Sequence, residues 1–308
     1  MDGHSVLKLM DEITIILQKE YQLVKITFIV IDDSLGYDTC LSHLIDGREI
    51  LRDDGSSVVL LTPAYKGGNQ SSILWALHSL SWPSSDKAFL IVMDADGEDS
   101  PHDLPRMMRK LSEENLDLVY AKRGKRFSPF SFRAGKLAFS ILFRILTGKF
   151  LETGNFSVMR VLWLKKCLDM GNFTSSFAGE LSYLPSRKTT ILCDRAPRLR
   201  GASKTNFSAL VTFGMRQLIP WCEIIAVRTF FWFSVASVMT GGITGLILLL
   251  KYHYGLATPA WSTLVVGLSS IVTLISLMLF ILSISILIQT DSAKRVIRLI
   301  EARNNPKS

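Results

Sequence analysis

Apolar residues are unevenly distributed along the chain and concentrate towards its C-terminal end. Residues 229–250 and 262–288 contain no charged side chain, and each segment is long enough to cross the ~30 Å hydrocarbon core of a bilayer. Buried core helices of a soluble fold are the alternative, but they seldom lack charge over such lengths. We therefore predict two transmembrane helices. Neither is a signal peptide, because both lie far from the N-terminus.

Upstream of these segments, short apolar runs alternate with helical patterns. Residues 6–21 place apolar side chains at helical spacing, and residues 25–31 form a β-branched run that ends in Asp32 and Asp33. The same order recurs, with strands expected at 57–61, 88–93, 116–120 and 189–193, helices at 71–80 and 104–111, and a helical, basic pattern over 127–160. Strands that alternate with helices indicate a doubly wound, mostly parallel α/β sheet covered on both faces.

The pattern predicts four consecutive parts. Residues 1–205 form the α/β domain, and residues 206–228, which mix bulky apolar and charged side chains, form interfacial amphipathic helices. Residues 229–288 hold the two transmembrane helices, and residues 289–308 form a basic tail helix. One lysine lies between the two apolar segments, whereas five Lys or Arg residues follow the second. Both termini are therefore expected on the cytoplasmic side.

The composition and charge of the chain indicate which kinds of molecule it could bind. The chain has a formal net charge of +8 and is 48% hydrophobic, and its basic residues gather beside the predicted membrane segments. Anionic lipid head groups or a phosphate substrate are the expected partners. Nucleic acid is not expected, because no binding motif or interleaving of aromatic and basic residues accompanies the charge. The four cysteines lack the close spacing of a zinc or redox pair and are expected to be reduced and structural.

Acidic residues follow two of the expected strands. Asp94 and Asp96 come directly after a buried strand, and Asp32 and Asp33 end an earlier one. Two carboxylates, together with a nucleotide diphosphate, make the oxygen-rich site that Mg²⁺ or Mn²⁺ prefers, and ligands of such sheets bind beyond the carboxyl ends of the strands. A solvated turn at Asp94–Asp96 and a helix N-cap cluster at Asp32 and Asp33 are the structural alternatives.

Two groups of basic and hydroxyl residues could hold a phosphate at the membrane surface. Guanidinium groups bind phosphate in a bidentate manner, although any one of these residues is equally well explained as a solvated or lipid-facing charge. The first group is Arg123, Arg126, Arg133 and Lys136, and the second is Arg198, Arg200, Ser203 and Lys204.

Taken in order, these motifs resemble the family-2, GT-A fold polyprenyl-phosphate glycosyltransferases, which include dolichol-phosphate mannose synthase and bacterial undecaprenyl-phosphate glucosyltransferases. Ile31-Asp32-Asp33-Ser34 is similar to the nucleotide loop of that family, and Asp94 to Pro101 is similar to its metal loop. Residues 154–159 resemble its Gly-Asp-Phe-Arg-Leu segment, residues 200–204 its Arg-x-Gly-x-Ser-Lys motif, and residues 293–306 its C-terminal amphipathic helix.

The resemblance implies an enzyme that moves a sugar from a nucleotide-sugar donor to a polyprenyl phosphate on the cytoplasmic face of a membrane, the bacterial inner membrane in particular. It assigns the metal and donor diphosphate to Asp94 and Asp96, the nucleoside to Asp32 and Asp33, and catalytic roles to Asp96 and Asn155. The acceptor phosphate would contact Arg123, Arg133, Arg200, Ser203 and Lys204.

The chain departs from the family pattern in two places. Asn155 stands where the family usually has an aspartate. The chain also begins at about the point where the family's first strand and Pro-x-Tyr-Asn-Glu loop should end, so either the true start lies further upstream or the chain is a divergent member with impaired donor binding. These departures keep a second function open, a catalytically impaired membrane adaptor with the same fold and lipid-phosphate site. A polymerising synthase with a secretion channel is less favoured, because two helices cannot enclose a pore. Homo-oligomer formation stays undecided.

Overall fold

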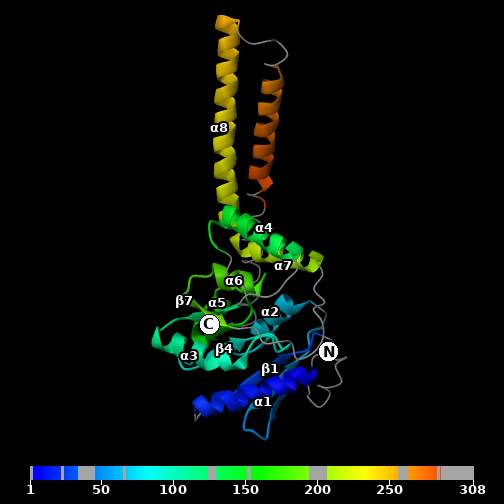
Figure 1. Cartoon of the computed structure of the whole chain (residues 1–308), viewed down its shortest axis with the longest axis vertical. Coiled ribbons are helices and arrows are strands. Elements are labelled where there is room, and N and C mark those ends of the chain that lie inside the picture. Colours follow the sequence, from blue (N-terminus) through cyan, green and yellow to red (C-terminus); the bar gives the residue numbers. More distant parts are fainter. Residues whose placement is uncertain are drawn as a thin grey trace, which may run out of the picture. The chain divides into compact units, whose positions relative to one another are not determined.

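The computed structural model describes residues 3–21, 24–33, 46–64, 67–123, 130–150, 154–193, 207–255, 263–282 and 285. The chain divides into two compact units, one of residues Met1–Lys136 and Leu151–Pro220 and one of Leu137–Phe150 and Trp221–Ser308. Figure 1 shows both. The predicted tail helix at 289–308 lies outside the described residues.

The first unit contains seven strands and most of the helices that the structure describes. The strands are β1 (Thr27–Ile31), β2 (Glu49–Leu51), β3 (Ser57–Leu61), β4 (Phe89–Val92), β5 (Leu118–Arg123), β6 (Ser157–Arg160) and β7 (Lys188–Cys193). The helices of this unit are α1 (Gly3–Glu20), α2 (Asn69–Ser79), η2 (Pro101–Asp103), α3 (Leu104–Glu113), α5 (Val161–Asp169), α6 (Phe177–Tyr183) and α7 (Phe207–Leu218). The α/β class predicted from the sequence is confirmed.

The strands form two mixed sheets, so the expectation of a mostly parallel sheet is corrected. Their orders are β1-β3-β2 and β4-β6-β5-β7. Only the β1·β3 and β5·β7 ladders are parallel, whereas β2 and β6 run antiparallel to their neighbours. The sequence analysis did not identify β2, which forms a hairpin with β3 through the turn at Gly55 (φ 80°). It also placed β6 inside a helical stretch, because four residues are too few to show a period of two.

One strand of each sheet, β1 and β4, is apolar but not fully covered. β1 (TFIVI) and β4 (FLIV) are continuously apolar, as strands inside a sheet usually are, but neither contains a fully buried residue. Within the described residues, β1 and β4 form no ladder with each other.

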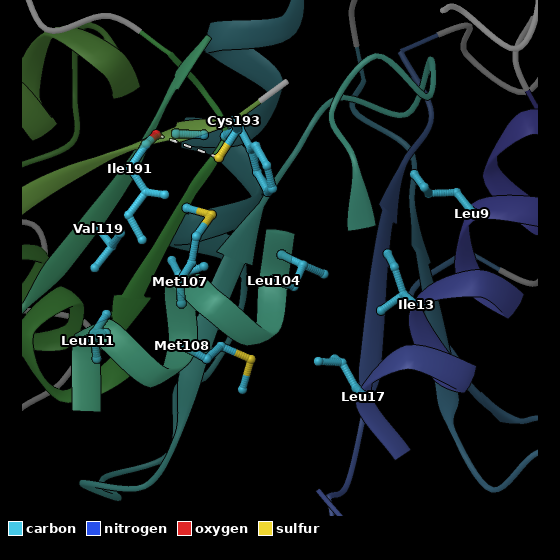
Figure 2. Packing of buried hydrophobic residues seen from close by; sticks show 13 residues of the cluster. Leu9, Ile13, Leu17, Leu104, Met107, Met108, Leu111, Val119, Ile191 and Cys193 are labelled. Atoms are coloured by element: carbon cyan, nitrogen blue, oxygen red, sulfur yellow. Dashed lines mark hydrogen bonds between the residues drawn. The ribbon is translucent and has the colours of Figure 1, made fainter. Parts of the chain in front are cut away.

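One apolar cluster joins the two sheets through their helices. It includes Leu9, Ile13 and Leu17 of α1 together with Leu104 and Met108 of α3, and Figure 2 shows the side chains of the two helices facing each other. A second cluster lies among α2, α5, α6 and β5. The first unit therefore has helices packed on both sheets, and the acidic loops at the strand ends are held by this framework.

The described cysteines are free thiols, as expected for reduced, structural residues. Burial raises the pKa of Cys167 to about 11, with Asp117 and Glu180 adding to the shift. Burial also raises the pKa of Cys193 to about 11. Both thiols are therefore protonated and unreactive near neutral pH.

The second unit is built around two long helices. It contains residues 137–147 of α4 (Phe130–Thr147), the end of η3 (Ile219–Trp221), α8 (Cys222–Tyr254) and the helix Thr263–Leu282. By length and composition, Val211–Tyr254 and Thr263–Leu282 could each cross a membrane, and they agree in position with the two predicted spans. Phe230 and Phe280 bring the two helices together, with ring centroids 4.5 Å apart.

The predicted border between interfacial and membrane helices at residue 228 is not a break in the structure. The helical path is interrupted earlier, at η3 around Pro220, and α8 then continues from Cys222 to Tyr254. Proline lacks the backbone N–H of a helix interior, which explains the position of the break. A single helix therefore carries both the charged residues before 229 and the apolar stretch after it.

Candidate active site

The acidic loop after β4 folds around its own carboxylates. Asp99 Oδ2 accepts a hydrogen bond from the Asp94 amide at 3.1 Å, and Asp96 Oδ1 accepts one from the Glu98 amide at 3.0 Å. Gly97 between them has φ 80°, a conformation that favours glycine. Asp99 is 2% exposed and Glu98 is 4% exposed, whereas Asp94 and Asp96 are only half-buried. Asp99 thus stabilises the loop, and Asp94 and Asp96 remain partly exposed.

The first turn of α2 reaches two of the predicted acidic residues. Asn69 Nδ2 donates to Asp94 Oδ1 at 3.0 Å, and Ser72 Oγ donates to Asp33 Oδ1 at 3.1 Å. Residues three apart lie on the same side of a helix, so one turn of α2 holds carboxylates that follow β4 and β1. The positive end of the helix dipole also favours negative charge there.

Asn155 also contacts Asp94, and a buried glutamine fixes its orientation. Gln70 is 5% exposed, and its Oε1 accepts from the Ala178 amide at 3.0 Å and from Ser176 Oγ at 3.3 Å. Its Nε2 must therefore be the group that donates to Asn155 Oδ1, at 2.7 Å. That leaves Asn155 Nδ2 as the donor to Asp94 Oδ1, at 3.3 Å.

The sequence analysis missed Asn69, Gln70 and Ser72. It began the helix at residue 71, although the Gly68-Asn69 pair before it is a recognisable helix-start signal, since glycine and asparagine favour such positions. Gly68 has φ 78° and precedes α2 directly. Nothing in the sequence could have indicated the bond between Gln70 and Ala178, which lie 108 positions apart.

Asp32 continues the sheet, whereas Asp54 lies in a turn. Asp32 is 7% exposed and its amide donates to Leu61 O at 2.9 Å, which continues the β1·β3 ladder. Asp54 lies in the β2–β3 turn. Desolvation would raise the pKa of Asp54, but hydrogen bonds from Ser56 and the charge of Arg52 lower it. Asp54 is therefore a structural residue.

The structure leaves the predicted acceptor-phosphate residues untested. Arg123 ends β5 and Arg133 lies in α4, but their side chains lie outside the described part of the chain. Arg200, Ser203 and Lys204 lie entirely outside the described residues, as do Arg126 and Arg198.

The described residues can supply part of a divalent cation site. Asp94 and Asp96 offer hard carboxylate oxygens of the kind that Mg²⁺ and Mn²⁺ bind. Among the residues that the structure describes, no three His, Cys, Asp or Glu side chains gather where they could hold a metal ion. A cation at Asp94 and Asp96 fits if the donor diphosphate and water complete its ligands, which is common for Mg²⁺.

One known protein family matches the part of the chain that contains this loop. Residues 77–168 match Glycosyl transferase family 2. The matched stretch runs from the end of α2 into α5 and contains Asp94, Asp96 and Asn155. The match implies a GT-A type α/β fold for this part of the chain.

One curated relative has a related description. A protein of Synechocystis sp. described as an uncharacterized glycosyltransferase is 24% identical over 183 residues, which make up 58% of this chain and 57% of that protein. The chain thus spans somewhat more than half of that relative's length.

Proposed function

We propose that this protein transfers a sugar from a nucleotide-sugar donor to a polyprenyl phosphate at the cytoplasmic face of a membrane, with the bacterial inner membrane as its location and both termini in the cytoplasm. The observation that carries the proposal is the half-buried pair Asp94 and Asp96, within the stretch that matches family 2. The two long apolar helices support the choice of a membrane lipid as acceptor.

In this proposal, Asp94 and Asp96 hold a divalent cation, Mg²⁺ or Mn²⁺, which would neutralise the diphosphate leaving group. The chain's own contribution is to fix these carboxylates before the donor arrives. Asn69 and Asn155 both donate to Asp94 Oδ1, and Asp99 holds the Asp94 backbone. Preorganised groups of this kind need no reorganisation during the reaction.

The nucleophile would be an oxygen of the acceptor phosphate. Because that phosphate is already ionised at neutral pH, the transfer depends on positioning and charge neutralisation more than on a strong base. A neutral amide at Asn155 is therefore compatible with turnover. The resemblance assigns the acceptor phosphate to Arg123, Arg133, Arg200, Ser203 and Lys204, and the nucleoside to Asp32 and Asp33, of which Asp33 is held by Ser72.

The alternative function is a catalytically impaired membrane adaptor. The observation that favours it is the pair of half-exposed apolar strands β1 and β4, which form no ladder with each other in the described part of the chain. An incomplete sheet beside Asp33 would weaken binding of the nucleoside. An adaptor of this kind would keep the lipid-phosphate site without turning over the donor.

Product formation in membranes tests the two functions directly. Vesicles containing the full chain and polyprenyl phosphate are incubated with a panel of labelled nucleotide sugars, and the lipid-linked sugar is extracted. We expect a product that disappears in Asp96→Ala and on chelation of divalent cations, but not in Asp53→Ala, because Asp53 is exposed in the β2–β3 turn. If the folded chain yields no product with any donor, the enzyme proposal fails and the adaptor stands.

A further inference from the structure

The second half of α4 carries an exposed apolar face. Leu137, Ile141, Leu142 and Ile145 are 63%, 52%, 44% and 61% exposed, and their successive spacings of four, one and three place them on one side of a helix. Phe143 on the other side is fully buried. A helix on an ordinary water-exposed surface has polar residues on its outer face, so this face needs a cover.

The charged residues within this segment all have the same sign. Residues 137–150 contain no Asp or Glu, and their only charged residues are Arg144 and Lys149. The Arg144 guanidinium lies 4.4 Å from the ring centroid of Phe150, whose side chain is 67% exposed. An aliphatic face bordered by cations and an exposed aromatic ring is typical of helices that lie in a lipid interface.

Two contacts join α4 to the beginning of α8. Phe143 packs edge-on against Trp221, with ring centroids 5.7 Å apart. At the end of α4, a Cβ on Gly148 would lie 2.0 Å from Arg228 Nη1, so the guanidinium of Arg228 rests directly against this glycine. Figure 1 shows α4 lying across the start of α8.

Because of these contacts, the end of α4 lies beside the start of the apolar part of α8. Its partners, Trp221 and Arg228, come just before residue 229, where the charge-free stretch begins. If residues 229–250 span a bilayer, as the proposed function assumes, then Trp221 and Arg228 lie at the boundary between head groups and acyl chains. α4 must lie at the same boundary.

We propose that the second half of α4 is an interfacial helix and that the surface of the bilayer covers its apolar face. Leu137, Ile141, Leu142 and Ile145 lie among the outer parts of the acyl chains, and Arg144 and Lys149 contact anionic head groups. The inference rests on the proposed membrane span in α8, and it adds a lipid contact in a segment for which the sequence analysis predicted only a helical, basic pattern.

Site-specific fluorescence in vesicles tests this placement. In the full chain with Cys40→Ser and Cys222→Ser, Ile141→Cys is labelled with an environment-sensitive NBD dye, because Cys167 and Cys193 are buried and protonated. We expect a blue-shifted emission that is quenched by nitroxides on lipid acyl chains and protected from a water-soluble quencher. Labelled Lys87→Cys, at an exposed position before β4, should behave as in water.

The contact with anionic head groups is tested by a second measurement, in vesicles of two lipid compositions. In vesicles that contain phosphatidylglycerol, we expect Arg144→Gln and Lys149→Gln each to shift the inserted fraction of the labelled helix about fivefold towards the free state, as expected for the loss of one cation near an anionic surface. In vesicles of phosphatidylcholine alone, the same substitutions should have little effect.

A label at Leu246→Cys in α8 separates this inference from the proposed function. Acyl-chain quenching at 246 but not at 141 would overturn the interfacial helix and leave the membrane span standing. Absence of quenching at both positions would overturn the span as well. A label at 141 that neither quencher reaches would show that protein covers this face, for example a second copy of the chain, and would also overturn the proposal.

Discussion

The side-chain amide of Asn155 donates to Asp94 Oδ1 across 3.3 Å. A neutral donor therefore lies beside the Asp94 carboxylate, whereas a second carboxylate at position 155 would repel Asp94. Asn69 donates to the same oxygen from α2, so two amides from different parts of the chain share the negative charge of Asp94. Hydrogen bonds to an ionised acceptor are stronger than those between neutral groups.

Asn155→Asp should destabilise the metal-free protein because it replaces this donor by a like charge. We expect a loss of about 1–3 kcal/mol in the free energy of unfolding near pH 7, measured by urea denaturation. The deficit should shrink in acid, where one of the two carboxyl groups takes up a proton and can donate again. Added Mg²⁺ or Mn²⁺ should also reduce it, because three carboxylates would then surround the cation site.

A matched variant separates repulsion from simple loss of an amide. Asn172 Nδ2 donates to a carbonyl, Cys167 O, at 3.1 Å, so Asn172→Asp removes a comparable donor away from Asp94. Its stability should not respond to divalent cations. An equal response of the two variants to Mg²⁺ would contradict the placement of a cation beside Asp94.

The sequence indicated where the acidic residues of the candidate site lie, but not which residues hold them in place. Asp94 and Asp96 could be placed because an apolar run followed by acidic residues is a local pattern. The role of Gln70 could not, because its contacts with Asn155 and Ala178 exist only after residues 85 and 108 positions apart have come together. β6 was missed for a related reason, since its pairing with β4 and β5 is entirely tertiary.

Gln70→Ala should destabilise the first unit strongly and loosen Asn155. The substitution leaves the Ala178 amide and Asn155 Oδ1 without their partner at a site where Gln70 is 5% exposed. Unsatisfied buried groups cost about 1–3 kcal/mol each, so we expect a loss of roughly 2–4 kcal/mol in urea denaturation. Gln18→Ala is the control, because Gln18 makes one exposed hydrogen bond, to Asp54 O at 2.9 Å. Similar losses in the two variants would show that the Gln70 network contributes little.

The ion pair between Asp117 and Arg187 gives stability a defined pH dependence. Burial would raise the pKa of Asp117, but hydrogen bonds from the Arg187 side chain and amide, together with its charge, lower it below the usual value. A carboxyl whose folded pKa is depressed stabilises the fold above its unfolded pKa of about 3.9. That contribution is lost as the pH falls through the folded pKa.

Asp117→Asn should therefore weaken the protein at neutral pH and matter less in acid. We expect a loss of about 0.5–1.5 kcal/mol near pH 7, in the range of partly exposed charge-assisted bonds, and convergence with the parent chain only as the pH falls through the folded pKa. Urea denaturation over this range measures the difference. A deficit that stays constant with pH would mean that the substitution acts through packing and not through the ion pair.

Gly148 shows how a backbone conformation and a side-chain contact combine at the junction of α4 and α8. It has φ 76°, and an added Cβ would meet Arg228 Nη1 at 2.0 Å. Gly255 ends α8 with φ 63° but has nothing within 4 Å of the same position. Gly255→Ala should therefore cost only the backbone strain, about 1 kcal/mol, whereas Gly148→Ala must also displace Arg228.

We expect Gly148→Ala to lower the thermal stability of the full chain, in one detergent, more than Gly255→Ala does. Because the guanidinium is the flexible end of a long side chain, the additional loss should be modest, about 0.5–1.5 kcal/mol. In an Arg228→Ala background the clash has no partner, so the cost of Gly148→Ala should fall to that of Gly255→Ala. If the two alanine substitutions remain unequal in that background, Arg228 does not account for the difference, and the contact that holds α4 against the start of α8 has to be sought elsewhere.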